Sequence, residues 1–184
     1  MGGFALDAQP DKGTHLRYGS TETPLGQVTV AVLDGEVCWL SYAGCKPAEW
    51  ELELWSKSCL GASVRLTEGG EDVQSVIDEL HEYFSGERRQ FDTSVTFLGG
   101  TPFQRKVWQE LLNIPYGEVR TYKDIAKAIG MPKAVRAVGR ANNKNPISII
   151  VPCHRVIGSN GALVGYGGGL DKKEYLLRLE GYLK

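Results

Sequence analysis

Alternating apolar and polar positions near the start of the chain predict a β-hairpin. The segment GQVTVAVLDGEVCWLSYAG (26–44) alternates on both sides of Asp34-Gly35. An Asp-Gly pair between two alternating runs is typical of a type I′ turn. A later run, QFDTSVTF (90–97), alternates in the same way and is predicted to be another strand.

Two segments between these strands have apolar residues at helical spacing. It occurs in PAEWELELWSKS (47–58) and in EDVQSVIDELHEYFSG (71–86), where Gly86 ends the pattern. One face of the second segment consists of Val73, Val76, Ile77, Leu80 and Phe84. Both segments are therefore predicted to be amphipathic helices.

Two domains are predicted, residues 1–98 and 99–184, here called the N-terminal and C-terminal halves. The N-terminal half combines strands with helices and the C-terminal half is mainly helical, so the fold class is α+β. Thr101-Pro102 begins the C-terminal half with an N-cap followed by proline at the first helical position. The core-facing residues of that helix are Phe103, Val107, Leu111 and Leu112, before NIPYG breaks the pattern.

A helix-turn-helix is predicted after this helix. Thr121 and Asp124 resemble a capping box, and the short helix that follows stops at Gly130. Pro132 restarts a helix, so a turn of roughly three residues places 132–142 in the position of a recognition helix. The residues predicted to face inward are Ile125, Ala126, Ile129, Ala134, Val135 and Val138. Those predicted to face outward are Lys133, Arg136 and Arg140.

Charge is divided unevenly between the two halves. Residues 1–100 carry 7 Lys and Arg against 16 Asp and Glu, whereas residues 101–184 carry 14 against 6. From Arg120 to Arg155 there are 8 basic residues and 1 acidic residue. This asymmetry is typical of a nucleic-acid-binding surface. The alternative, a basic half docked on an acidic half, does not explain why basic residues gather around the predicted helix-turn-helix.

Composition favours a cytoplasmic protein without a metal. No window is long and apolar enough to span a membrane, and the start, MGGFALDAQPDKG (1–13), lacks the features of a signal peptide. Thiols stay reduced in the cytoplasm. The cysteines lack the close pairing of a zinc site, although a dispersed site using His15, His81 or the early cysteines is left open. The four cysteines are Cys38, Cys45, Cys59 and Cys153.

A cysteine and a histidine stand side by side after the most apolar run of the chain. ISIIVPCHRV (147–156) predicts a buried strand that ends at Pro152, directly before Cys153. A thiol reacts as the thiolate and needs a base or positive neighbours at pH 7. Neighbours on an extended chain point to opposite faces, so His154 reaches Cys153 only through a bend or a bridging water. The alternative is a buried, inert cysteine.

Three segments of the C-terminal half together resemble the O6-alkylguanine-DNA alkyltransferases, also called methylated-DNA–protein-cysteine methyltransferases. They are TPFQRKVWQELLNIPYGEVRTY (101–122), GMPKAVRAVGRANNKNP (130–146) and PCHRVIGSNGALVGYGGGLDKKEYLLRLEG (152–181). Pro-Cys-His-Arg-Val in this setting is specific to the family. The resemblance implies irreversible transfer of an alkyl group from O6-alkylguanine, and from O4-alkylthymine, to the protein's own cysteine.

The resemblance also implies a catalytic relay. Cys153 corresponds to the alkyl acceptor, and His154 to the base that deprotonates it through a water. Glu180 corresponds to the carboxylate that orients the histidine, which gives a nucleophile, a base and an orienting group. Asn145 corresponds to the asparagine that ties the active-site segment to the helix-turn-helix. Tyr122 corresponds to the tyrosine that pushes on the target phosphate and assists the guanine leaving group.

Further residues are implied in DNA binding and in the substrate pocket. Arg136 corresponds to the arginine that enters the duplex and fills the place of the flipped base, with Lys133 and Arg140 as basic neighbours. Tyr166, in the GYGGG loop, corresponds to the lid over the base pocket, and Val156 and Lys173 are placed in that pocket. At Gly167 many relatives carry a larger, hydrogen-bonding residue, so this position departs from the family.

The expected partner is double-stranded DNA containing alkylated guanine, bound as a monomer and without sequence preference. No cofactor is expected, because the thiol itself is the reagent. Three alternative hypotheses are considered with this interpretation. They are a non-catalytic lesion-sensing protein, in which the cysteine is normally replaced, a DNA-binding regulator with a structural Cys153, and a cysteine hydrolase, which would not need the basic helix-turn-helix.

Overall fold

The computed structural model describes residues 14–42 and 47–184. Cys45 and residues 1–13, on which the expectation about a signal peptide rests, lie outside the described residues. Within the described ranges, no helix has the length and apolarity needed to cross a membrane.

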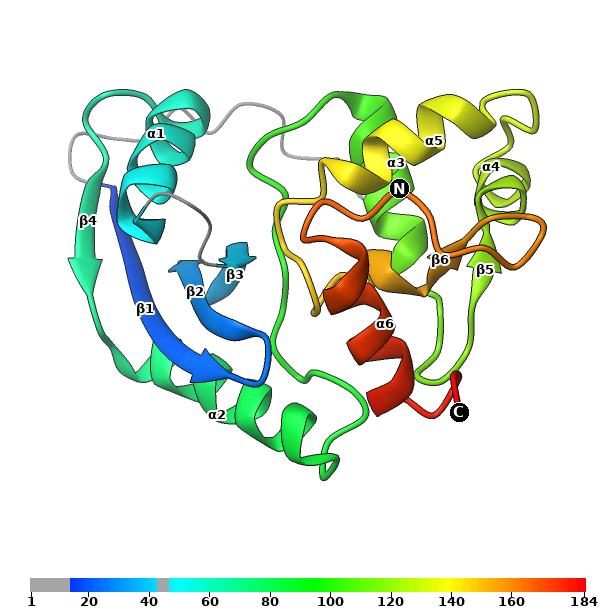
Figure 1. Cartoon of the computed structure of the whole chain (residues 1–184). Helices are drawn as coiled ribbons and strands as arrows, with labels where there is room; N and C mark the ends of the chain where they lie inside the picture. Colours follow the sequence, from blue (N-terminus) through cyan, green and yellow to red (C-terminus); the bar gives the residue numbers. More distant parts are fainter. Residues whose placement is uncertain (1–13, 43–46) are drawn as a thin grey trace.

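A four-stranded sheet forms the N-terminal half (Figure 1). Its strands are β1 (His15–Thr23), β2 (Gly26–Leu33), β3 (Glu36–Tyr42) and β4 (Arg65–Glu68), in the order β3-β2-β1-β4. β2 is antiparallel to both β1 and β3, and β4 runs parallel to β1. The predicted hairpin is confirmed, because Asp34 and Gly35 have φ values of 51° and 82°, as a type I′ turn requires. β1 and β4 are additional to the predicted strands.

Two helices cover opposite faces of this sheet. Leu52 of α1 (Ala48–Leu60) packs with Ala31 and Trp39 on one face. α2 (Glu71–Ser85) packs on the face formed by alternate valines of β2, and ends at Gly86 in the left-handed conformation that favours glycine. The predicted inward face of α2 is confirmed, with Phe84 only partly buried.

The strand predicted over residues 90–97 is wrong. Among the described residues, this segment forms a single bridge to the sheet, between Val37 and Val95. The Glu79 carboxylate of α2 accepts hydrogen bonds from the backbone N–H groups of Asp92, at 2.8 Å, and Thr93. Because these two N–H groups bond to Glu79, they do not pair with a neighbouring strand. The alternating pattern therefore belongs to a segment that packs over the core without forming a strand.

The C-terminal half is mainly helical. Its elements are α3 (Pro102–Leu111), β5 (Arg120–Thr121), α4 (Tyr122–Ala128), α5 (Val135–Asn143), the 3₁₀ turn η1 (Cys153–Arg155), β6 (Val156–Ile157) and α6 (Leu170–Leu179). Both predicted caps are confirmed as complete capping boxes, at Thr101 with Gln104 and at Thr121 with Asp124. The short strands β5 and β6 pair in parallel.

The predicted helix-turn-helix is present as α4 packed against α5, but its turn is longer than expected. The helix predicted over 132–142 begins only at Val135, because residues 131–134 form a turn in which the Ala134 N–H bonds to the Met131 carbonyl at 2.9 Å. Lys133 therefore lies in the connection between the helices and not on the recognition helix. Arg136 and Arg140 are exposed on α5, as predicted.

One continuous apolar core joins the two halves. It combines the α2 face of the sheet with side chains from α3, α4, α5 and α6 and from the segment around Cys153. Because the two halves share this core, side chains of the N-terminal half pack in the same cluster as Cys153.

Candidate active site

The apolar run before Cys153 is a series of turns and not the predicted strand. The Val151 N–H bonds to the Ile147 carbonyl, and Ile149 has a φ of 71°, an uncommon conformation for a β-branched residue. The side chain of Asn145 holds these turns, since its amide donates to the Val151 carbonyl at 2.8 Å and accepts from the Ile147 N–H at 3.0 Å. Local side-chain bonding therefore overrides the strand propensity of the run.

Cys153 begins the 3₁₀ turn η1 and is 3% exposed. Burial raises the pKa of its thiol, while hydrogen bonding from Asn145 and the charge of Lys173 act in the opposite direction. Cys38 provides a comparison, because burial raises the pKa of that thiol to about 12, and its Sγ atom donates to the Ala31 carbonyl. Both thiols are buried, but the side-chain amide of Asn145 and the charge of Lys173 favour the thiolate at Cys153, and no such side chain of the described residues lowers the pKa of Cys38.

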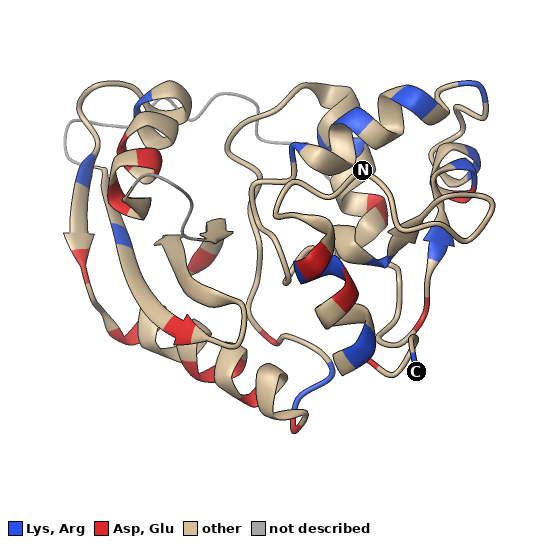
Figure 2. Ribbon diagram, in the orientation of Figure 1, with Lys and Arg blue, Asp and Glu red and all other residues tan. Residues whose placement is uncertain are grey.

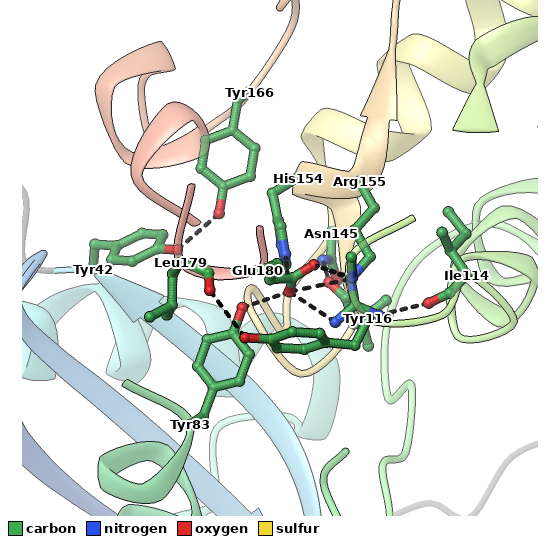
Figure 3. A network of polar contacts seen from close by, with 12 residues as sticks. Tyr42, Tyr83, Ile114, Tyr116, Asn145, His154, Arg155, Tyr166, Leu179 and Glu180 are labelled. Carbon is green, nitrogen blue, oxygen red and sulfur yellow. Dashed lines mark hydrogen bonds and ion pairs between the residues drawn. The ribbon is translucent and has the colours of Figure 1, made fainter. Parts of the chain in front are cut away.

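His154 is fully buried beside Cys153 and is fixed by Glu180 (Figure 3). The His154 Nε2 atom lies 2.9 Å from the Glu180 Oε1 atom. An ionised carboxylate only accepts, so Nε2 carries the hydrogen and the lone pair of the neutral ring is on Nδ1. Among the described residues, Nδ1 has no hydrogen-bond partner. Burial lowers the pKa of His154 against the opposing effect of Glu180, so the ring is a neutral base at pH 7.

Glu180 directly follows α6 and is the centre of a buried polar network. Burial alone raises the pKa of this carboxyl, but hydrogen bonds from His154 and Arg155 outweigh it and hold the pKa well below its usual range. Arg155 binds both carboxylate oxygens, and its guanidinium also donates to the Ile114 carbonyl. Tyr83 donates to Oε1 at 2.6 Å, and the Gly117 N–H to Oε2 at 3.2 Å.

Two side chains of this network, those of Arg155 and Tyr83, are additional to the predicted site residues. Arg155 stands in the Pro-Cys-His-Arg-Val motif, so its position was visible in the sequence even though no role was inferred for it. Tyr83 lies on α2, in the N-terminal half, and the sequence shows only an aromatic residue beside an apolar helix face. Its contact with Glu180 depends on how the two halves pack.

Lys173 and Tyr122 both hold the loop that contains Tyr166. The Lys173 ammonium donates to the carbonyls of Val156 and Val164, and burial lowers the pKa of Lys173 to about 8. The Tyr122 hydroxyl donates to the Val164 carbonyl at 2.8 Å, and burial raises its pKa to about 12. Both groups thus meet the loop at the same carbonyl, and Tyr122 stays a protonated donor at neutral pH.

A cavity of about 400 Å³ reaches Cys153 from the side of the N-terminal half. Tyr166 lines it, and its hydroxyl bonds to that of Tyr42, on β3, at 2.7 Å (Figure 3). Asn142 also lines the cavity and donates weakly to the Cys153 carbonyl. Val156 is fully buried beside the cysteine turn. Of the predicted pocket residues, Tyr166 lines the cavity, whereas Val156 and Lys173 are fully buried and are not among the residues that line it; Tyr42 and Asn142 are additional lining residues.

Basic residues are concentrated along α4, α5 and their connection (Figure 2). Lys133, Arg136 and Arg140 are all exposed there, whereas acidic residues mark α1 and α2 of the N-terminal half (Figure 2). A cationic surface of this kind suits the phosphate backbone of a nucleic acid. Among the described residues, no group of three His, Cys, Asp or Glu side chains is placed to hold a metal ion.

Comparison with known proteins identifies relatives over most of the chain. Residues 102–182 match the family model described as 6-O-methylguanine DNA methyltransferase, DNA binding domain. The methylated-DNA–protein-cysteine methyltransferase of Methanosarcina acetivorans is 46% identical over 169 residues, which cover 90% of this chain and 99% of the relative.

Solved structures agree with this similarity. The OGT protein of Mycobacterium tuberculosis in complex with DNA is 41% identical, with a TM-score of 0.75 over 89% of this chain and 92% of that one. The O6-methylguanine-DNA methyltransferase of Pyrococcus kodakaraensis is 31% identical, with a TM-score of 0.67 over 90% of this chain and 99% of that one. The α+β fold class is thereby confirmed.

Proposed function

The chain belongs to the methylated-DNA–protein-cysteine methyltransferases, enzymes of DNA repair by alkyl transfer, and from that premise we propose that Cys153 is its alkyl acceptor. In the proposed step, a bond forms between Sγ and the alkyl carbon of O6-alkylguanine as the bond from that carbon to O6 breaks. The electron pair stays on the guanine. The product is a thioether without a leaving group, so the protein reacts once and needs no cofactor.

The observation that carries this proposal is the free lone pair of His154. Its Nε2 atom is fixed on Glu180 and its Nδ1 atom is buried without a partner among the described residues. Nδ1 is therefore the group that takes the Cys153 proton, through a bridging water. A base beside a buried thiol is the arrangement that activates a cysteine nucleophile. It also favours catalysis over a lesion sensor or a DNA-binding regulator.

The remaining site residues are proposed to bring the lesion into the site and to help the guanine leave after the transfer. DNA binds the basic surface of α4 and α5 without sequence preference, and the lesion is flipped out of the duplex, at a cost of a few kcal/mol. Arg136, exposed on α5, fills the vacated place in the stack. Tyr122, a protonated phenol at neutral pH, assists the guanine as it leaves. O4-alkylthymine is proposed as a second substrate.

Intact mass measures the proposed reaction directly. After incubation with duplex DNA containing O6-methylguanine, we expect the protein to gain the mass of one methyl group in place of one hydrogen. Peptide mapping is expected to place this methyl on Cys153. An unchanged mass after the lesion has been lost from the DNA would contradict transfer to the protein, and methylation of Cys38 or Cys59 would contradict the assignment of the acceptor.

DNA binding is expected to depend steeply on salt and on Arg136. Lysine and arginine contacts to phosphates release counterions, so affinity falls as salt rises. Arg136→Ala is expected to reduce lesion extrusion, followed with a fluorescent base beside the lesion, more than it reduces total DNA binding. Arg65→Ala, which removes an exposed arginine from β4 in the acidic half, is the matched control and should change neither. Affinity that does not vary with salt would contradict the proposed surface.

A further inference from the structure

A tyrosine of the N-terminal half reaches the carboxylate of the relay. The Tyr83 hydroxyl, on α2, donates to the Glu180 Oε1 atom at 2.6 Å (Figure 3). The Tyr83 side chain is completely buried. The reaction proposed above gives Tyr83 no part, although its hydroxyl touches the group that orients the catalytic base.

The direction of this hydroxyl is fixed by packing. The Tyr83 ring lies against the rings of Phe84, Phe91 and Tyr116, with centroid distances between 5.3 and 6.1 Å. Burial and the negative charge of Glu180 raise the pKa of Tyr83 well above its ordinary value. The phenol is therefore a permanent donor, held in one orientation against a carboxylate that can only accept.

Tyr83 and His154 share one oxygen atom. Glu180 Oε1 accepts from the Tyr83 hydroxyl at 2.6 Å, from His154 Nε2 at 2.9 Å and from Arg155 Nη2 at 2.8 Å. All three donors bond to the same negatively charged atom, so a strong hydrogen bond from one of them reduces the negative charge available to the other two. On the basis of the proposed function, we propose that Tyr83 is a positioning residue. It holds Glu180 and limits how strongly this carboxylate stabilises protonated His154.

The other charged and polar groups around the relay stay in place when the Tyr83 hydroxyl alone is removed. They are Arg155 and Cys153 on η1, Lys173 on α6, the Gly117 N–H group and the Tyr116 hydroxyl. Tyr116 provides a matched control, because its hydroxyl donates at 3.0 Å to the carbonyl of Leu179, next to Glu180, without touching the carboxylate. Phenylalanine at either position keeps the ring and removes one hydrogen bond.

The test is the titration of His154 by NMR in the full-length protein, together with the pH dependence of methyl transfer. In Tyr83→Phe, Oε1 loses a donor and favours the imidazolium more, so the His154 midpoint should rise by about 0.5–1 pH unit. The acidic limb of the transfer rate should move to higher pH by the same amount. Tyr116→Phe should leave both midpoints in place. A folded Tyr83→Phe protein with the wild-type midpoints would overturn the proposal.

A second measurement needs no substitution. In the unmodified protein, the ring Cζ resonance of Tyr83 should change with the same midpoint as His154, because protonation of the imidazole alters the oxygen that both groups share. A Tyr83 resonance that does not respond while His154 titrates would overturn the proposal even if Tyr83→Phe fails to fold. Loss of the proposed function has a different signature, namely no methyl gain on Cys153 while the two titrations remain coupled.

Discussion

Replacing Cys153 with serine is expected to abolish repair completely while DNA binding persists. A serine hydroxyl is not ionised near pH 7, so the neighbouring base has no thiolate to generate. The basic surface of α4 and α5 is untouched by this change and should still bind DNA that contains the lesion. Cys59→Ser, at a half-buried thiol on α1, is the matched control and should repair at the wild-type rate.

The number of lesions repaired per protein molecule distinguishes the proposed single reaction from catalytic turnover. If Cys153 keeps the alkyl group, a titration of lesion-containing DNA should end at one repaired lesion per protein molecule, however long the incubation. The measurement is the amount of O6-methylguanine left in the DNA against the amount of protein added. Repair of more lesions than there are protein molecules would refute the irreversible step, even if Cys153→Ser is inactive.

Local signals in the sequence predicted much of the fold. The hairpin, the N-cap at Thr101, the capping box at Thr121 and the apolar face of α2 depend on residues close together in the chain, and all are confirmed. The errors arise where a distant or polar side chain decides the backbone. Glu79 captures the amides of residues 92 and 93, and Asn145 bends the apolar run before Cys153. Neither interaction is visible in an alternating or apolar pattern.

In the candidate site, too, features set by neighbouring residues were predictable and contacts between distant residues were not. Cys153, His154 and Glu180 were named from the motif and its resemblance, and the structure brings His154 and Glu180 within hydrogen-bond distance. The contacts from Tyr42 and Tyr83 could not be predicted, because both residues belong to the N-terminal half and meet the site only through the shared core. Their sequence positions are consistent with ordinary strand and helix packing.

Replacing Glu180 with glutamine is expected to slow methyl transfer and also to weaken the fold. Loss of a positioned general base typically costs about 10²–10⁴-fold in rate, and within residues 14–42 and 47–184 Glu180 is the hydrogen-bond partner that orients His154 as a base. Arg155 is buried with Glu180 as its ion-pair partner, so the amide leaves its charge uncompensated. Breaking a buried pair from one side costs about 3–5 kcal/mol, so a substitution aimed at the rate also acts on stability.

Glu79→Gln is the matched control for this experiment. Glu79 is also a buried carboxylate with an arginine partner, Arg88 at 3.5 Å, but it anchors the segment after α2 and does not contact the relay. Both variants should lower the free energy of unfolding measured with denaturant. At a temperature where both are folded, Glu180→Gln alone should lose the transfer rate at neutral pH. Equal rates in the two variants would show that Cys153 draws its activation from elsewhere.

The pH dependence of stability gives an independent check on Glu180. Its folded pKa lies below the unfolded value of about 4.3, so its contribution is fully present above that value and is lost as the pH falls toward the folded pKa. The difference in unfolding free energy between the wild type and Glu180→Gln should therefore be constant near pH 7 and shrink below about pH 4. A difference that stays constant into acid would mean that the carboxylate gains nothing from Arg155 and His154, contrary to the network seen in the fold.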